Sequence, residues 1–166
     1  MDIDGIRSPF LFEGAVREAI HQLKYRSVKA LAAPLAQLVG EYLSEKSLPF
    51  EVMVPVPLHP HRLRNRGYNQ SLLVAQELAE IRSMPLVEDV LVRLSDTSPQ
   101  AKTRSAEERQ KNVAQAFSCR RLELEGKRVL LIDDVCTSGA TLNACAAALK
   151  AGGAASVWGL TVAREV

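Results

Sequence analysis

The sequence has few cysteines, few aromatic residues and almost no excess of charge, and each shortage excludes a class of protein. Three cysteines among 166 residues, with no C-x-x-C pair, leave a thiol unpaired and argue against a disulfide framework or a structural zinc site. The net charge of +2, from 21 basic and 19 acidic side chains, lacks the strong basic excess of proteins that coat DNA or an anionic membrane. Any polyanion would therefore have to be bound by a local group of basic residues.

Long apolar runs and targeting signals are missing as well. No stretch approaches the ~20 apolar residues that cross a bilayer, and the N-terminus has no basic region followed by a long apolar segment. With 47% hydrophobic residues, a chain of this length can bury a substantial core. We therefore expect one cytoplasmic domain over residues 1–166, without membrane insertion.

Apolar periodicity predicts a pair of amphipathic helices in the N-terminal third. Apolar residues fall at helical spacing over 12–23 and again over 31–42, with Pro34 suited to the first turn of the second helix. The apolar run 50–56 is too short for a helix and ends in prolines, so we interpret it as a buried strand. A basic loop over 59–67 follows it.

The rest of the chain alternates strands with helices. We predict these elements: a helix over 69–81, a strand over 87–94, a strand over 128–132, a helix over 141–151 and a strand over 157–162. Between them, residues 95–115 are small, polar and charged, which is typical of a mobile excursion or an exposed helix. This order predicts an α/β fold with a largely parallel sheet flanked by helices on both faces.

The predicted strand at 128–132 runs directly into two acids, Asp133 and Asp134. In parallel α/β sheets, ligands bind beyond the carboxyl ends of the strands, which is where these acids lie. Neighbouring side chains of a regular strand point to opposite faces, so both carboxylates serve one ligand only where the chain is already turning.

The loop after the acids has the residue types of a phosphate cradle. Gly139 permits close backbone approach, and the hydroxyls of Thr137, Ser138 and Thr141 can donate hydrogen bonds. The helix that follows presents unpaired N–H groups and a positive dipole end. Taken alone, the acids would equally well end a strand, with Thr141 as a helix cap. The complete pattern favours a phosphorylated ribose, and the glycine motifs of other nucleotide sites are absent.

Here the sequence carries a resemblance. Four apolar residues, two acids, a hydrophobic pair and Thr-Ser-Gly-Ala-Thr resemble the phosphoribosyl diphosphate signature of type I phosphoribosyltransferases. The likeness implies that Asp133 and Asp134 are catalytic, contacting the ribose hydroxyls and Mg2+, the latter directly or through water. It also implies a substrate-binding segment made of Val135, Cys136, Thr137, Ser138, Gly139, Ala140 and Thr141. The implied ligand is phosphoribosyl diphosphate or a nucleotide, with Mg2+ as cofactor.

Other segments resemble the ComF branch of that family, the competence and GntX-like proteins. They are Val54 to His59, Arg62 to Gln70, Pro99-Gln100, Arg109, Asn112 to Phe117, and Leu23-Lys24-Tyr25. The resemblance thus covers nearly the whole chain. The branch commonly has an N-terminal Cys-rich zinc-binding segment, and nothing before Phe12 supplies one here.

Basic residues in two segments are candidates to contact the diphosphate. Arg64, Arg66 and the Gly67 backbone belong to the basic loop, and guanidinium groups bind phosphate oxygens in bidentate geometry. Arg104 and Arg109 lie in the excursion, where type I phosphoribosyltransferases place a hood that excludes water from the reacting centre. Either segment taken alone is also compatible with an ordinary solvated surface.

Two further features have structural interpretations. His59 and His61 have no matching third ligand, so we interpret them as surface residues rather than a metal pair. Cys136 lies near a helix N-terminus, which lowers thiol pKa values, but no histidine or aspartate is placed to make it a nucleophile. We interpret it as a packing residue.

Two functions stay open on the sequence. One is transfer of the phosphoribosyl group to a nitrogenous base, with Mg2+ and arginines stabilising the departing diphosphate; neither the acceptor nor a general base can be named. The alternative is a non-catalytic competence or DNA-uptake protein. It would bind single-stranded DNA through residues 59–66, with Tyr68 as the nearby stacking residue, or bind a protein of the competence machinery. A homodimer is also an open expectation.

Overall fold

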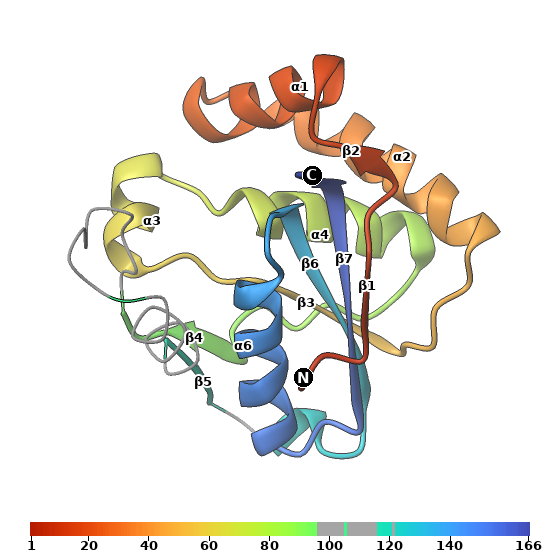
Figure 1. The fold of residues 1–166 in the computed structure, drawn as a ribbon, viewed down its shortest axis with the longest axis vertical. Coiled ribbons are helices and arrows are strands. Elements are labelled where there is room, and N and C mark those ends of the chain that lie inside the picture. The colour runs from red at the N-terminus through yellow and green to blue at the C-terminus, as the bar shows by residue number, and fades with distance from the viewer. Residues whose placement is uncertain (96–104, 106–115, 121) are drawn as a thin grey trace.

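The computed structural model describes residues 1–95, 105, 116–120 and 122–166, and it contains a parallel sheet. The strands lie in the order β1-β7-β6-β3, with β2 also paired to β7 (Figure 1). Their bounds are β1 Gly5–Arg7, β2 Phe10–Leu11, β3 Val52–Pro55, β6 Arg128–Cys136 and β7 Ser156–Arg164. The predicted α/β fold with a largely parallel sheet is confirmed.

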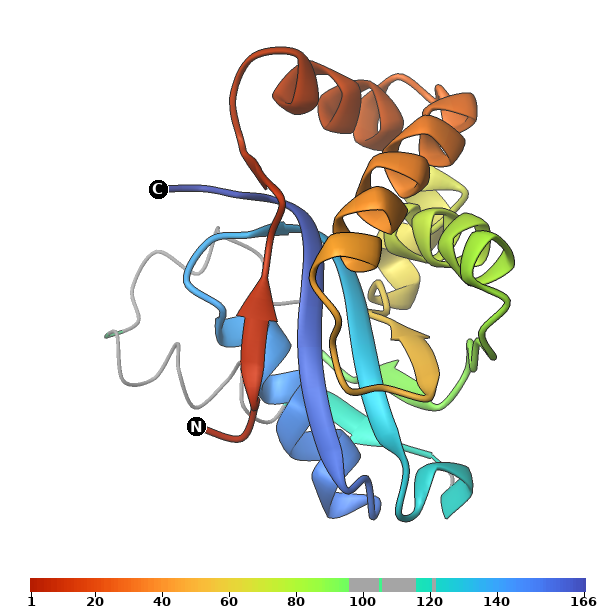
Figure 2. The ribbon, with the colours of Figure 1, turned by 90° about the vertical axis from the view of Figure 1, so that its right-hand side faces the viewer.

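Helices cover both faces of this sheet. They are α1 Gly14–Tyr25, α2 Ala32–Glu45, α3 Pro60–Arg66, α4 Gln70–Arg82 and α6 Ala140–Ala151, with short 3-10 turns at Lys29–Leu31 and Leu122–Leu124. Figure 2 shows α2 and α4 on one side of the sheet and α6 on the other. In both views α1 lies beyond the carboxyl ends of β6 and β7 (Figures 1 and 2). No helix of the described segments is long and apolar enough to cross a membrane.

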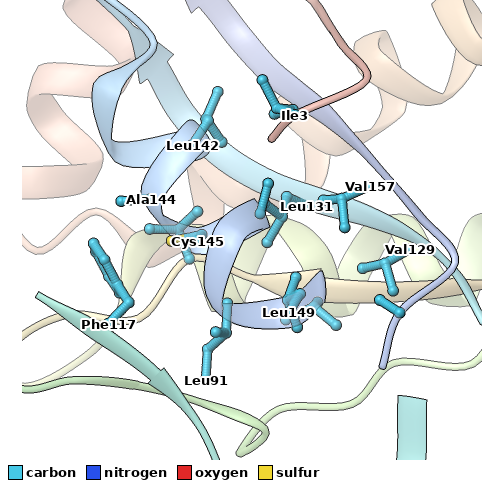
Figure 3. Packing of buried hydrophobic residues seen from close by; sticks show 14 of the residues in the cluster. Ile3, Leu91, Phe117, Val129, Leu131, Leu142, Ala144, Cys145, Leu149 and Val157 are labelled. Carbon is cyan, nitrogen blue, oxygen red and sulfur yellow. The ribbon is translucent and has the colours of Figure 1, made fainter. Parts of the chain in front are cut away.

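Side-chain alternation along β6 divides the core into two layers. Val129 and Leu131 pack on the α6 side, whereas Leu130 and Ile132 pack against α1, α2 and α4. Figure 3 shows the first layer, in which Leu142 and other side chains of α6 meet the sheet. These side chains are almost completely buried, as a parallel sheet covered on both faces requires. The two layers hold β6 rigidly and so determine where its carboxyl end lies.

Two predicted boundaries were wrong at this end of the sheet. The strand predicted to end at Ile132 continues to Cys136, because its last residues pair with β7. The predicted basic loop is the helix α3. Pro60 lies in its first turn, the ring of His59 accepts a hydrogen bond from the backbone N–H of His61, and Gly67 ends it at φ 88°.

Other parts of the chain also differ from expectation. The strand predicted over 87–94 is reduced to β4, Leu91–Arg93, which pairs antiparallel with β5, Phe117–Cys119, in a separate small sheet beside α6. The N-terminal strands β1 and β2 were not predicted; their short segments contain glycine and proline and show no alternation. The excursion predicted over 95–115 lies almost entirely outside the described residues.

Candidate functional site

The two acids at the end of β6 turn back onto their own backbone. Asp133 pairs with Thr161 in the ladder to β7. The N–H of Asp134 donates to Asp133 Oδ1 at 2.9 Å, and the N–H of Val135 donates to Asp134 Oδ1 at 2.7 Å. Each carboxylate therefore leans toward the following residue instead of standing perpendicular to the sheet.

Both carboxylates reach the N-terminus of α4. Ser71 Oγ donates to Asp133 Oδ1 at 2.8 Å, and Gln70 Nε2 donates to Asp134 Oδ2 at 3.1 Å. The Asn69 side chain caps this helix by accepting from the Ser71 N–H at 3.0 Å, which fixes the first turn of α4. Strand geometry led us to expect a turn at these acids, but both still lie in β6, and their carboxylates nevertheless reach the same helix terminus.

An ion pair from the N-terminal helix completes the surroundings of Asp134. Lys24 Nζ, in the last turn of α1, lies 3.0 Å from Asp134 Oδ2, and Asp134 is only 4% exposed. Burial opposes ionisation of Asp134, but the Lys24 ammonium and the hydrogen bonds outweigh it, so the pKa of Asp134 is lowered. Burial likewise opposes the charge on Lys24, and the attraction of Asp134 outweighs it and raises the pKa of Lys24.

Asp133 has the opposite electrostatic setting. Burial, followed by the negative charge of Asp134, raises the pKa of Asp133 to about 8 from an ordinary 3.8, although the Ser71 hydrogen bond acts against this. The raised pKa favours the protonated form of Asp133 at neutral pH, whereas Asp134 stays ionised beside the Lys24 ammonium. The neighbouring acids are chemically distinct.

The loop between β6 and α6 is open to solvent. Thr137 and Ser138 are exposed, and Gly139 adopts a left-handed conformation at φ 83° directly before the helix. Gly139 makes no side-chain cap, and the Ser138 hydroxyl accepts weakly from the Ala140 N–H at 3.3 Å. The first N–H groups of α6 thus point toward a solvent-exposed loop with two hydroxyls, next to Asp133. Such a terminus is suited to an anion.

Comparison with known proteins places this arrangement in a family. Residues 69–164 match the model of the phosphoribosyl transferase domain. The chain belongs to this family. Within it the chain is ComF-like: it is 38% identical over 114 residues to competence protein F of Haemophilus influenzae, covering 66% of this chain and 49% of that protein. It is 30% identical over 164 residues to competence protein ComFC of Bacillus subtilis, covering 96% and 64%.

One further relative and one solved structure are also similar to this chain. The DNA utilization protein YhgH of Salmonella typhimurium is 34% identical over 145 residues, covering 83% of this chain and 62% of that protein. The chain thus spans roughly half to two thirds of the length of these relatives. Glutamine phosphoribosylpyrophosphate amidotransferase of B. subtilis shares the fold with a TM-score of 0.53 and 22% identity, over 78% of this chain and 26% of that one.

The phosphoribosyltransferase motif contains two residues whose side chains face the core. Val135 and Cys136 still belong to β6; Val135 is half-buried against the α2 and α4 layer, and Cys136 is 6% exposed. Burial raises the pKa of the Cys136 thiol, which is opposite to the effect expected from the nearby helix N-terminus. Cys136 packs in the α6 layer of the core, in line with its interpretation as a packing residue. The solvent-facing part of the motif is therefore 137–141.

Of the basic segments predicted to contact the diphosphate, the structure describes the one at α3 but not the one in the excursion. The Arg66 guanidinium lies 5.5 Å from the Tyr25 ring centroid, and its Nη1 donates to Gln70 Oε1. Arg64 and Gly67 are exposed on α3 and at its end. Because β3 pairs with β6, the segment that leads into α3 starts at the same edge of the sheet as the loop 137–141. Arg104 and Arg109 lie outside the described residues.

Sequence reasoning missed three residues that contact the acids: Lys24, Gln70 and Ser71. Lys24 and Gln70 lie in segments that resemble the ComF branch, but no local spacing indicates that they converge on Asp134. Tyr68, expected to offer a stacking surface, is instead 7% exposed and its hydroxyl donates to the carbonyl of Leu23. The phosphoribosyl motif thus identifies the loop 137–141, but it does not indicate that α1 and α4 contact the acids at the end of β6.

Proposed function

We propose that this chain binds Mg2+-phosphoribosyl diphosphate at the carboxyl end of β6 and transfers the phosphoribosyl group to a nitrogenous base. The observation that supports it is the solvent-exposed loop 137–141 at the N-terminus of α6, which directly follows the strand that carries the half-buried Asp133. A ribose 5-phosphate requires such a donor-rich loop at one end and a hydroxyl acceptor at the other.

The loop would hold the 5-phosphate. Its oxygens would accept from the first backbone N–H groups of α6 and from the hydroxyls of Thr137, Ser138 and Thr141. Gly139 is needed because of its φ of 83° and because a Cβ there would lie 3.1 Å from Ile6 Cδ1. A side chain at this position would strain the loop and press against Ile6, and so would displace the backbone that is to meet the phosphate.

Asp133 would serve the ribose and the cation. Carboxylate oxygen is the type of ligand that Mg2+ prefers, so the acid fits the ion. Among the described residues, no group of three or more His, Cys, Asp or Glu side chains could form a metal site made of protein alone. Mg2+ would therefore bind chiefly to the diphosphate, with Asp133 as its protein contact, and would neutralise the charge that develops as diphosphate departs. Arg64 and the Gly67 backbone would meet the diphosphate from α3.

Calorimetric titration of phosphoribosyl diphosphate, with and without Mg2+, tests this function. We expect micromolar binding that requires Mg2+ and weakens at least tenfold in Asp133→Asn. Glu41→Gln, which removes an exposed carboxylate on α2, serves as the matched control and should bind like wild type. An absence of binding by folded wild-type protein would refute the proposal, and binding unchanged in Asp133→Asn would refute the role of that acid.

A second candidate function, binding of single-stranded nucleic acid, has support from a different surface. Tyr25 is 64% exposed, its ring lies 5.0 Å from that of His21, and Arg66 lies over it. A hollow along the same helix is lined by Arg17, His21 and Arg26, together with Glu18 and Gln22. An exposed aromatic ring among basic side chains is suited to stacking on a base beside a phosphate backbone. The relative named as a DNA utilization protein agrees with such a role.

Fluorescence anisotropy with a labelled single-stranded oligonucleotide tests the second candidate. Tyr25→Ala should weaken binding about tenfold, because stacking contributes about 1–3 kcal/mol per base. Tyr42→Phe, on α2, is the control and should have no effect. Affinity should fall steeply with salt. Equal binding by Tyr25→Ala and wild type would exclude this surface.

A further inference from the structure

Lys24 has surroundings that few lysines have. It ends α1, whose Ile20 and Leu23 are fully buried and anchor the helix on the core. Its side chain is only 22% exposed, and its ammonium lies 3.0 Å from Asp134 Oδ2. A lysine that gives up most of its hydration needs a partner, so this pair is a built feature rather than a surface contact.

Asp134 has little capacity left for a ligand. Its Oδ2 accepts from both Lys24 and Gln70, and its Oδ1 accepts from the N–H of Val135. A carboxylate offers about four acceptor sites, of which at least three are taken, and only 4% of the residue is exposed. A ribose hydroxyl or a cation reaches Asp134 only if one of these partners leaves.

The partners of Asp134 are themselves fixed by a closed set of contacts. The Gln70 amide donates to Asp134 through Nε2 and accepts from Arg66 through Oε1, which determines its orientation. Arg66 in turn lies over the ring of Tyr25, the residue next to Lys24. These contacts join α1, α3, α4 and β6, so a displacement of α1 would disturb the acid and the arginine together.

We propose that Lys24 is a positioning residue that neutralises Asp134 in place of a metal ion, fastens α1 over the carboxyl end of β6, and leaves Asp133 as the acid presented to the ligand. The part that concerns the ligand rests on the function proposed above; the part that concerns α1 does not. Lys24 cancels the charge of Asp134, so the site offers a free divalent cation at most the single charge of Asp133, which weakens its attraction for the ion. The cation then arrives with the diphosphate rather than before it.

A double-mutant cycle in the ligand-free protein tests the attachment of α1. Lys24→Met should leave a buried unpaired carboxylate, lower the Tm by roughly 10 °C and reduce hydrogen-exchange protection in α1 at least tenfold. Adding Asp134→Asn should recover much of both losses, and Lys24→Arg should retain most of the protection. Lys46→Met, at an exposed lysine after α2, is the control. Strictly additive effects of Lys24→Met and Asp134→Asn would overturn the proposal.

Titration with Mg2+ or Mn2+ alone measures the affinity for the free ion, which would not depend on the charge of Lys24 if this lysine only stabilised the fold. Wild type and Lys24→Arg should bind the free ion weakly. Lys24→Gln, which keeps a hydrogen-bond donor but removes the charge, should bind it at least tenfold more tightly. The gain should vanish when Asp134→Asn is added. Equal ion affinity in wild type and a folded Lys24→Gln variant would contradict the proposal.

Titration with phosphoribosyl diphosphate separates this proposal from the proposed function. Asp133→Asn should lose at least ten times more affinity than Asp134→Asn, because only Asp133 would contact the ligand. Equal losses in the two variants would overturn the division of roles. If wild type does not bind the ligand, the proposed function fails, whereas the coupling of Lys24 to Asp134 is still decided by the double-mutant cycle and the ion titration.

Discussion

Replacing Asp133 by asparagine should change stability by an amount that depends strongly on pH. The pKa of Asp133 is raised to about 8 in the folded chain from an ordinary 3.8. Between these values the folded state keeps a proton that the unfolded state has lost. The stability that this proton provides is complete below about 3.8 and is lost as the pH rises through about 8. Asparagine cannot ionise, so the variant escapes the loss.

The size of the effect follows from the same shift. A rise of about 4 pK units corresponds to at most about 6 kcal/mol, at 1.36 kcal/mol per unit. Because Asp133 is only half-buried, water entry and relaxation will reduce this, and we expect about 2 kcal/mol at pH 9. For a chain of this size, 2 kcal/mol raises the Tm by roughly 4–8 °C. The Ser71 hydroxyl can donate to the asparagine oxygen as it does to the carboxylate, so no contact is lost.

Thermal unfolding of both proteins between pH 4.5 and 9, in buffer with EDTA, measures the difference. Comparing variant with wild type at each pH cancels the other titrating groups, so the Tm gain should be largest at pH 9 and clearly smaller at pH 4.5. Asp134→Asn provides the contrast. The pKa of Asp134 is lowered, so its stabilising effect is present above about 3.8 and is lost as the pH falls. A Tm difference for Asp133→Asn that is the same at both ends would refute the reasoning.

Two further substitutions test the framework of the site by urea unfolding. Gly139→Ala should cost about 1–3 kcal/mol, because φ is +83° and the new methyl group would lie 3.1 Å from a β1 side chain. Gly67→Ala, at φ +88° with open space around the methyl position, has the same backbone strain but no close contact and should therefore cost less. An equal cost in the two variants would show that the contact with Ile6 contributes nothing. Tyr68→Phe should cost about 1–2 kcal/mol, because it removes the donor to a buried α1 carbonyl. Tyr25→Phe, at an exposed ring, should be neutral, and equal values would argue against the Tyr68 hydrogen bond.

The elements that the sequence predicts well are those whose pattern is local. The apolar run 129–132 is buried on both faces, and helical spacing over 12–23 and 31–42 corresponds to α1 and α2. The continuation of β6 through two acids has no such signal, because aspartate is depleted in strands. Here the ladder to β7 and the hydrogen bonds from α4 override the local preference.

The helix α3 was not predicted because its sequence is dominated by charged residues. Its seven residues include three arginines and a histidine, and little apolar periodicity indicates a helix. The signals were instead at its ends: Pro60 in the first turn and Gly67 immediately after the last residue are the asymmetric pair that bounds many helices. The strongly basic composition of the segment favours a solvated loop, and these two end signals outweigh it.

The candidate site also has one part that the sequence predicts and another that it does not. The loop 137–141 is contiguous, so its residue types and spacing reveal it. Gln70 and Ser71 reach the acids across 64 and 62 residues of chain, and Lys24 comes from still farther away. These contacts depend on how α1 and α4 pack on the sheet. No local pattern encodes that packing, and a motif can therefore assign two acids to one role when the fold gives them two.

Near-neutral overall charge and a pair of adjacent acids are a poor starting point for binding a diphosphate, whose own charge is strongly negative. The structure resolves this conflict locally. Lys24 neutralises Asp134, and the raised pKa of Asp133, about 8, favours the uncharged form of that acid at neutral pH. The ligand-free site therefore presents almost no net negative charge beside the N-terminus of α6, so that its dipole and N–H groups can attract a phosphate without repulsion from the acids. Asp133 would be the acid that holds Mg2+ when the cation is bound together with the diphosphate, since Asp134 is already occupied by Lys24 and Gln70.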